Sequence, residues 1–200
     1  MIKIAVFASG NGSNAENIIR YFKDNEEIRV ALIISNKANA YVHTRAKNLG
    51  VPSCTFSKDE FEKGDPILQK LREYQIDFIV LAGFLLKIPD SILKAYPQRI
   101  INIHPALLPK YGGKGMYGNH VHKAVLQAGE KESGISIHYV NERYDEGDII
   151  FQARCPVLPS DTCEELAQRV HRLEYEYYPR VIEKIAKQAC GEIDKKNDEQ

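Results

Sequence analysis

Short apolar runs, rich in β-branched residues, recur through the first hundred residues of the chain. Runs of about four to eight such residues with no polar side are typical of strands buried on both faces. Such runs predict strands at residues 2–8, 28–34, 77–82 and 100–104, and a weaker signal predicts a short one at 54–57.

The residues between these runs follow a helical repeat. It predicts helices at residues 14–23, 40–48 and 66–74. Strands that alternate with helices indicate a mostly parallel sheet with helices on both faces, which is a Rossmann-like, doubly wound α/β fold. In such folds ligands collect at the carboxyl ends of the strands.

The pattern changes after Gly113. A helical repeat covers residues 120–127, and polar and apolar residues alternate over 133–140 and 149–157, which predicts two strands at an antiparallel edge of the sheet. A long C-terminal helix is predicted to begin at Asp161, where Glu164 would complete a capping box three residues later.

Apolar residues repeat along this last helix and predict a stripe that faces the core. Its members are Leu166, Val170, Leu173, Tyr177 and Val181. Pro179 should kink or restart the helix. We expect residues 1–190 to form one domain, with a phosphate-binding half at 1–100 and a catalytic half at 101–190, followed by a polar tail at 191–200.

Composition narrows the function classes. The 27 basic and 27 acidic side chains cancel, which argues against binding to nucleic acid or to an anionic membrane. No apolar run approaches the roughly 18 residues that span a bilayer, and the first residues lack a signal-peptide pattern. The four cysteines form no CxxC pair, so we expect reduced thiols, no metal site and a cytoplasmic location.

A glycine-rich loop follows the first predicted strand. Gly10, Gly12 and Ala15 fit the spacing G-x-G-x-x-[GA] between a strand and a helix, and Ser13 and Asn14 add side-chain donors. Backbone N–H groups at a helix start attract anions, so the loop predicts a phosphate site. The second strand is followed by Ser-Asn-Lys with no acid, which argues against NAD and less strongly against NADP. The alternative is a tight turn without a ligand.

The segment INIHPALLPKYGG places Asn102 and His104 at the end of the fifth predicted strand. Residues two apart in a strand point to the same side. An Asn amide can stabilise an oxyanion, and an imidazole can carry a proton near neutral pH. Because no nucleophilic Ser or Cys motif is present, the pair favours direct attack by a substrate group on a carbonyl. The alternative is a structural hydrogen bond of the His.

Acidic residues in the segment NERYDEGDII could supply a third member. They are Glu142, Asp145, Glu146 and Asp148. An acid close to His104 would raise the pKa of the ring and orient it. The sequence does not say which of the four reaches the ring.

Four segments together resemble one enzyme family. SGNGSN, LAGFLLKIP, NIHPALLPKY and the turn at residues 144–147 occur in the order seen in phosphoribosylglycinamide formyltransferases, and the likeness covers about residues 1–190. The resemblance implies the formyltransferase fold and transfer of a formyl group from the co-substrate 10-formyltetrahydrofolate to glycinamide ribonucleotide in purine biosynthesis. It implies no metal, and both a monomer and a homodimer stay open.

The same resemblance implies roles for individual residues. Asn102, protonated His104 and Asp145 match the catalytic residues. Gly12, Ser13, Asn14 and Glu174 match residues that bind the ribonucleotide. The residues that match the folate site are Leu85, Leu86, Lys87, Ile88, Asn102, Asn141, Glu142, Arg143, Tyr144 and Asp145.

Two departures from the family pattern stand out. The stretch at residues 112–118 is longer and richer in glycine than usual, and it could be a mobile flap or a spacer. An Arg that contacts the folate tail in many members, near residues 63–65, has no clear counterpart, and a nearby Lys could replace it.

Three other functions compete. A formyltetrahydrofolate deformylase would use the same Asn, His and Asp with water as acceptor, but normally has an additional N-terminal domain that we do not expect here. A methionyl-tRNA formyltransferase normally adds a C-terminal domain for tRNA, which is not expected either. A nucleotide-binding module without catalysis would use the glycine loop alone and would leave the Asn, the His and the acidic turn unexplained.

Overall fold

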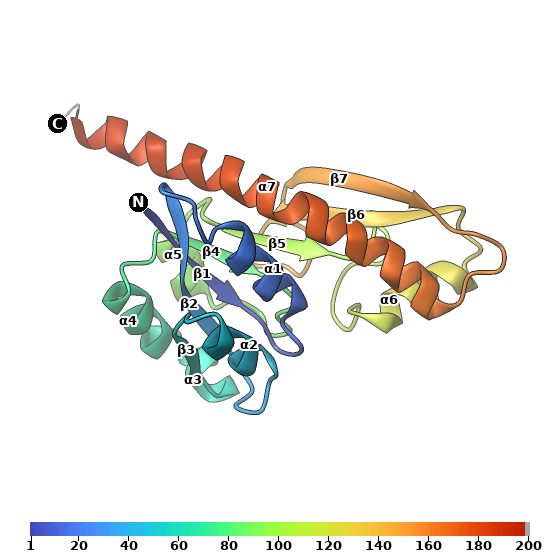
Figure 1. The fold of residues 1–200 in the computed structure, drawn as a ribbon, viewed down its shortest axis with the longest axis horizontal. Helices are drawn as coiled ribbons and strands as arrows, with labels where there is room; N and C mark the ends of the chain where they lie inside the picture. Colours follow the sequence, from blue (N-terminus) through green and yellow to red (C-terminus); the bar gives the residue numbers. More distant parts are fainter. Residues whose placement is uncertain (199–200) are drawn as a thin grey trace.

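Seven strands form one mixed sheet, in the order β3-β2-β1-β4-β5-β6-β7 (Figure 1). The computed structural model describes residues 1–198, and the side chains of residues 1–191. The strands are β1 (Ile2–Phe7), β2 (Ile28–Ser35), β3 (Ser53–Thr55), β4 (Phe78–Leu81), β5 (Ile100–His104), β6 (Glu132–Tyr139) and β7 (Ile149–Pro156). Strands β1 to β5 pair in parallel, and β6 and β7 add an antiparallel edge, which confirms the predicted fold class.

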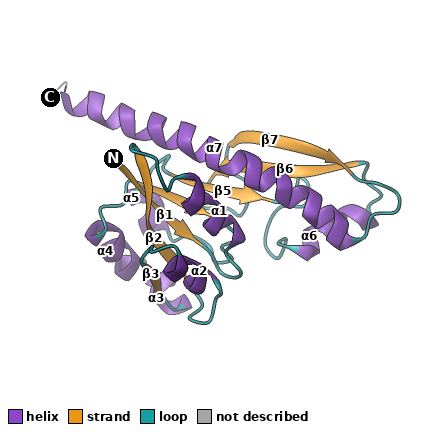
Figure 2. Ribbon diagram, in the orientation of Figure 1, coloured by secondary structure: helices purple, strands orange, loops and turns teal. Residues whose placement is uncertain are grey.

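Seven helices in the described residues cover the two faces of the sheet (Figure 2). They are α1 (Ser13–Tyr21), α2 (Val42–Asn48), α3 (Lys58–Lys63), α4 (Asp65–Glu73), α5 (Asp90–Ala95), α6 (Asn119–Gln127) and α7 (Cys163–Asp198). Buried residues of α1, α2, α6 and α7 share one core cluster, and those of α3, α4 and α5 share the other. The sheet therefore lies between two helical layers.

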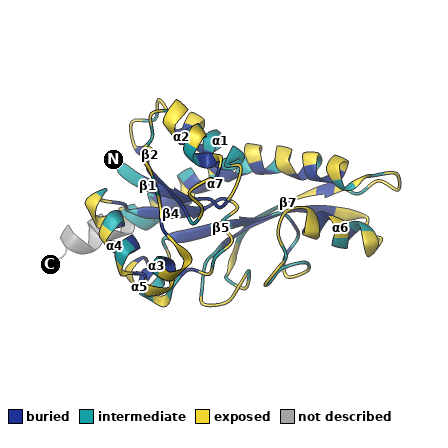
Figure 3. Cartoon of the chain, turned by 90° about the horizontal axis from the view of Figure 1, so that it is seen from below, coloured by how far each residue is buried: buried dark blue, intermediate teal, exposed yellow. Residues whose placement is uncertain are grey.

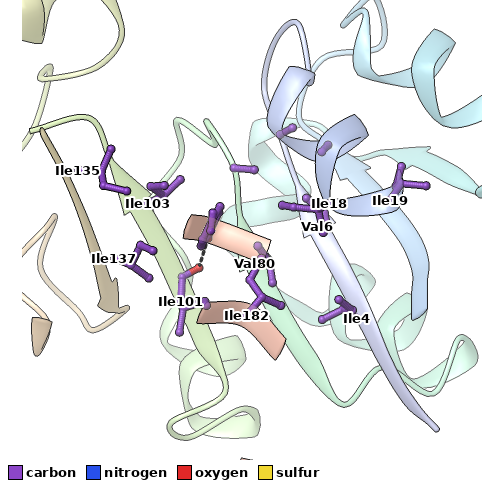
Figure 4. Packing of buried hydrophobic residues seen from close by; sticks show 14 of the residues in the cluster. Ile4, Val6, Ile18, Ile19, Val80, Ile101, Ile103, Ile135, Ile137 and Ile182 are labelled. Carbon is purple, nitrogen blue, oxygen red and sulfur yellow. Dashed lines mark hydrogen bonds between the residues drawn. The ribbon is translucent and has the colours of Figure 1, made fainter. Parts of the chain in front are cut away.

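Side chains alternate between the two faces of each strand, so the sheet separates the core into two clusters. On β1, Ile4 and Val6 belong to the cluster under α1 and α7, whereas Ala5 and Phe7 belong to the opposite cluster. Figure 4 shows the first cluster, in which Ile182 of α7 lies close to residues of the central strands. Figure 3 shows the burial of the chain, with buried strands in the middle and exposed helix faces around them.

Helix α7 begins later than the sequence predicts. Thr162 caps the helix: its backbone N–H and its hydroxyl donate to Glu165 Oε2 at 2.8 and 2.9 Å, and the N–H of Glu165 donates back to Thr162 Oγ1 at 3.2 Å. The predicted capping box of Asp161 and Glu164 is therefore wrong by one residue. Asp161 instead forms a two-point ion pair with Arg169, at 2.7 and 2.9 Å.

The buried stripe of α7 also differs from the prediction. Leu166 and Val170 are fully buried, but Leu173, Tyr177 and Val181 are only partly buried. The residues that complete the stripe are Glu174, Tyr178, Ile182 and Ala186, which continue the spacing of four from Val170. The prediction missed this register because Glu174, a charged residue, lies on the buried face.

Two further predictions concern Pro179 and the polar tail, both in the C-terminal part of α7. Pro179 lies inside the helix, which continues without a break, so Pro179 does not restart the helix, and the kink stays a prediction. The backbone is helical as far as Asp198, inside the predicted polar tail, whose last two residues lie outside the described part of the chain.

Candidate active site

A cavity of about 500 Å³ opens at the carboxyl ends of β1, β4 and β5. It is lined by residues 10–14, 82–85, 102–105 and 113–119, together with His122, Tyr144, Asp145, His171 and Glu174. This is the edge of the sheet where a doubly wound fold is expected to bind its ligand.

The glycine loop forms one wall of this cavity. Gly12 precedes α1 with a φ of 75°, and a Cβ at this position would collide with the side chain of Val42. Only glycine adopts this conformation without strain at so close an approach. The first turn of α1, which contains Ser13 and Asn14, therefore starts at the cavity with N–H groups that have no partner within the helix.

Arg45 of α2 stabilises the glycine loop through contacts with Asn11 and Glu16. Its guanidinium donates to the carbonyl of Asn11 at 2.9 Å and to the side-chain oxygen of Asn11 at 2.7 Å, and it pairs with Glu16 of α1. The sequence did not single out Arg45, because nothing local links it to a loop more than thirty residues earlier.

Glu174 of α7 reaches the same loop. Its Oε2 accepts from Asn14 Nδ2 at 2.8 Å and lies 2.7 Å from Nδ1 of His171. Asn14 Oδ1 is buried without a hydrogen-bond partner among the described residues, as is Nδ1 of His122, another residue of this wall. The structure thus brings together the residues predicted for the ribonucleotide and adds His122 and His171, which the sequence analysis missed.

Asn102, His104 and Asp145 meet at the end of β5. His104 Nδ1 lies 3.6 Å from Asp145 Oδ2, and Asn102 Nδ2 lies 3.4 Å from Asp145 Oδ1. Of the four acids in the turn, Asp145 is thus the one that reaches His104. His138, which the sequence analysis also missed, faces the same carboxylate from β6, with Nε2 3.6 Å from Oδ1.

Asp145 itself has an uncommon backbone conformation. Its φ of 57° lies in the left-handed region, which non-glycine residues rarely adopt although Asp is among those enriched there. The backbone N–H of Gly113 donates to Asp145 Oδ2 at 2.9 Å, so the glycine-rich stretch contacts the turn that carries Asp145 directly. Such outliers cluster at functional sites.

A second, smaller cavity of about 60 Å³ adjoins the first and shares Phe84, Asn102, Tyr144 and Asp145 with it. Most of the residues predicted for the folate line it, namely Leu86, Lys87, Ile88, Asn141, Arg143 and Tyr144. Leu85 lines the larger cavity instead, and Glu142 lines neither of the two. Phe84, Asn102, Tyr144 and Asp145 therefore lie where the two cavities adjoin.

Comparison with known proteins assigns the chain to a family. The model of the formyl transferase family matches residues 2–182. The chain belongs to the formyl transferase family. Its relatives include the chloroplastic phosphoribosylglycinamide formyltransferase of Arabidopsis thaliana, 43% identical over 93% of this chain, and the phosphoribosylglycinamide formyltransferase of Bacillus subtilis, 40% identical over 92% of it.

The chain spans different shares of the lengths of these relatives. It covers 66% of the Arabidopsis protein and 61% of a chloroplastic relative from Vigna unguiculata, but 95% of the Bacillus protein. Among solved structures, glycinamide ribonucleotide transformylase 1 from Symbiobacterium toebii has a TM-score of 0.85 at 34% identity, covering 94% of this chain and 89% of that one. Phosphoribosylglycinamide formyltransferase from Streptococcus pneumoniae has a TM-score of 0.82 at 40% identity, covering 92% and 99%.

The environment of His104 differs from the expectation of a protonated ring. Burial lowers its pKa below the ordinary value, and this outweighs the charge of Asp145 and the hydrogen bond to the Tyr111 carbonyl, both of which raise it. Asp145 therefore acts in the expected direction, but the ring is mainly neutral at pH 7.

Two other groups of the site have shifted pKa values. Burial alone would raise the pKa of Asp145, but the nearby rings of His138 and His104 and the N–H of Gly113 hold it below its ordinary value. The hydrogen bond with Glu174 raises the pKa of His171 in spite of its burial. Asp145 is therefore an anion at neutral pH, and His171 stays protonated to a higher pH than an ordinary histidine.

The structure also bears on metal binding and on membrane-spanning helices. Within residues 1–191, no group of three or more His, Cys, Asp or Glu side chains is arranged to hold a metal ion. None of the helices in the described part of the chain is long and apolar enough to cross a membrane.

Proposed function

We propose that this formyl transferase moves the formyl group of 10-formyltetrahydrofolate to the amine of glycinamide ribonucleotide, a step of purine biosynthesis. One observation carries the proposal: Asn102 and Asp145 line two adjoining cavities, one walled by a phosphate-type glycine loop and one by the residues that match the folate site. The names of the relatives, phosphoribosylglycinamide formyltransferases, support the same formyl acceptor.

The two substrates would occupy the two adjoining cavities. The phosphate of the ribonucleotide would lie at the start of α1, where N–H groups and the helix dipole favour an anion. The folate would lie against residues 86–88 and against Asn141, Arg143 and Tyr144. Binding energy from the distant phosphate then aligns the amine with the formyl carbon.

The chemistry proceeds by direct attack. The amine nitrogen forms a bond to the formyl carbon, and the Asn102 amide, a hydrogen-bond donor, stabilises the negative charge that develops on the formyl oxygen. Neutral His104 accepts the proton that the amine loses, and Asp145 stabilises the resulting imidazolium. The bond from the formyl carbon to the folate nitrogen then breaks, and that nitrogen receives the proton from His104 or from a held water.

The first experiment follows the absorbance of 10-formyl folate mixed with the purified protein, with and without glycinamide ribonucleotide. Loss of the formyl group only when the ribonucleotide is present would support the proposal. Equal loss without it would mean that water is the acceptor and would favour the deformylase. No loss in either mixture would leave only a nucleotide-binding module and would overturn the proposal.

A further inference from the structure

The ring of His104 has a second contact that the proposed chemistry does not explain. Its Nε2 lies 2.7 Å from the backbone carbonyl of Tyr111. A carbonyl oxygen can only accept, so Nε2 carries a proton and donates it. The nitrogen left to gain or lose a proton is Nδ1, which faces Asp145 Oδ2 at 3.6 Å. The Tyr111 carbonyl thus selects the tautomer of the ring.

Tyr111 is held in place by its side chain. It lies in the connection between β5 and α6 (Figure 1), with a φ of 58° in the left-handed region. Its hydroxyl donates to Glu130 Oε1 at 2.9 Å, and the ammonium of Lys110 donates to the same oxygen at 2.8 Å. A strained backbone conformation persists only where surrounding contacts stabilise it, and the hydrogen bond of the Tyr111 hydroxyl is one such contact.

Glu130 provides an ionised carboxylate that accepts from this hydroxyl. It lies in the turn between α6 and β6, and its backbone N–H donates to the carbonyl of Val125 at 3.3 Å. Hydrogen bonds from Lys110 and then from Tyr111 lower the pKa of Glu130, so the carboxylate is ionised at neutral pH. A continuous chain of contacts therefore runs from Glu130 through Tyr111 to His104.

We propose that Glu130 is a positioning residue for formyl transfer, and that it acts through Tyr111 to keep His104 in the tautomer with the proton on Nε2. Nδ1 is then the nitrogen that accepts the proton of the attacking amine, beside the carboxylate of Asp145. The part that concerns the reaction rests on the proposed function, whereas the part that concerns the tautomer does not.

The tautomer matters because the two nitrogens have different neighbours. The titratable groups that act on His104 are Asp145, His138 and Glu174. With the proton on Nε2, the lone pair of Nδ1 is free, and the imidazolium formed on Nδ1 is stabilised by Asp145. If Tyr111 moved away, the neutral ring could place its proton on Nδ1 and donate it to Asp145, and no basic nitrogen would remain beside that carboxylate.

The test combines ¹⁵N NMR of the histidine rings, without substrate, with steady-state kinetics. Glu130→Ala and Tyr111→Phe should each show a loss of the Nε2–H tautomer of His104. They should also lower kcat by about tenfold to a hundredfold, the scale of a small misplacement at a reacting group, with little change in KM. Tyr111→Phe removes only a hydroxyl, so it carries the test if Glu130→Ala does not fold.

Two variants serve as controls. Glu130→Gln keeps an oxygen that accepts from Tyr111 and should retain the tautomer and most of kcat. Lys110→Ala removes the ion pair with Glu130 but leaves the Tyr111 bond, and it should behave like the wild type. The wild-type tautomer in both Glu130→Ala and Tyr111→Phe would overturn the proposal, and so would a Lys110→Ala variant as impaired as Glu130→Ala. Because the NMR result needs no substrate, it stands even if the proposed transferase activity fails.

Discussion

At the scale of single residues, Asp145 organises the proposed reaction. One carboxylate faces His104, Asn102, His138 and the N–H of Gly113 at distances of 2.9 to 3.6 Å. Charge that is arranged before the reaction stabilises a transition state without a cost of reorganisation. The loss of that charge should therefore affect turnover far more than folding.

We expect His104→Ala and Asp145→Asn each to lower turnover by at least about a hundredfold, the usual scale for the loss of an acid–base or electrostatic group. Thermal unfolding and turnover are measured side by side. Glu146→Gln is a matched control, because this exposed acid lies next to Asp145 and pairs only with Arg143 among the described contacts. Turnover near the wild-type level in either site variant would remove that residue from the mechanism.

His171 should make ribonucleotide binding sensitive to pH. Glu174 raises the pKa of His171, so the imidazolium that faces the proposed phosphate site persists above the ordinary pKa of about 6.5 and is lost as the pH rises through the raised value. KM for the ribonucleotide should rise over that range. His171→Gln should lack this part of the profile and keep the part that comes from the phosphate itself. Identical profiles for the two proteins would contradict this role.

At the scale of elements, the approach of α2 to the start of α1 determines the shape of the glycine loop. Val42, the first residue of α2, lies where a side chain at Gly12 would have to be, and its N–H donates to the carbonyl of Gly10 at 3.2 Å. The two helices and the loop therefore form one packed unit. The position of the loop depends on the contact between Val42 and the loop glycines.

Gly12→Ala should lower the free energy of unfolding by about 1 to 3 kcal/mol, because a left-handed alanine is strained and its Cβ collides with Val42. Urea unfolding gives the number. Gly10→Ala is the control, since a Cβ there has no heavy atom within 4 Å and Gly10 has no positive φ. If the two variants were equally stable, the contact with α2 would not constrain the loop.

At the scale of the whole molecule, α7 joins the core to the site. Tyr178 is completely buried and donates to the backbone carbonyl of Leu81 at 2.8 Å and lies 3.3 Å from that of Ile101, at the ends of β4 and within β5. One turn earlier, Glu174 reaches Asn14 of α1. The same face of one helix thus packs the sheet and completes the cavity.

Tyr178→Phe should lower the free energy of unfolding by about 1 kcal/mol, the net contribution of a typical buried hydrogen bond, and should leave the fold intact. Tyr177→Phe is the control, because Tyr177 is only partly buried and its hydroxyl has no hydrogen bond among the described residues. A loss in Tyr177→Phe as large as that in Tyr178→Phe would mean that the two carbonyl contacts contribute nothing.

The sequence by itself determined the sheet, the glycine loop and the pair on β5. Apolar runs and glycine spacing are local signals, and residues two apart in a strand share a side wherever the strand lies. The local signal was also present for α3, where Ser57 and Glu60 form a capping box that the analysis overlooked. Helix α5, only six residues long, gave too weak a repeat to be predicted.

Only the tertiary structure decided which polar residues meet. Asn14 and Glu174 are 160 residues apart, and the contacts of Arg45, His138 and Glu130 likewise join separate elements. The buried position of Glu174 followed from contacts outside its own helix. Burial also reversed the expected net shift in the pKa of His104, because the cost of removing a charge from water depends on everything packed around the ring.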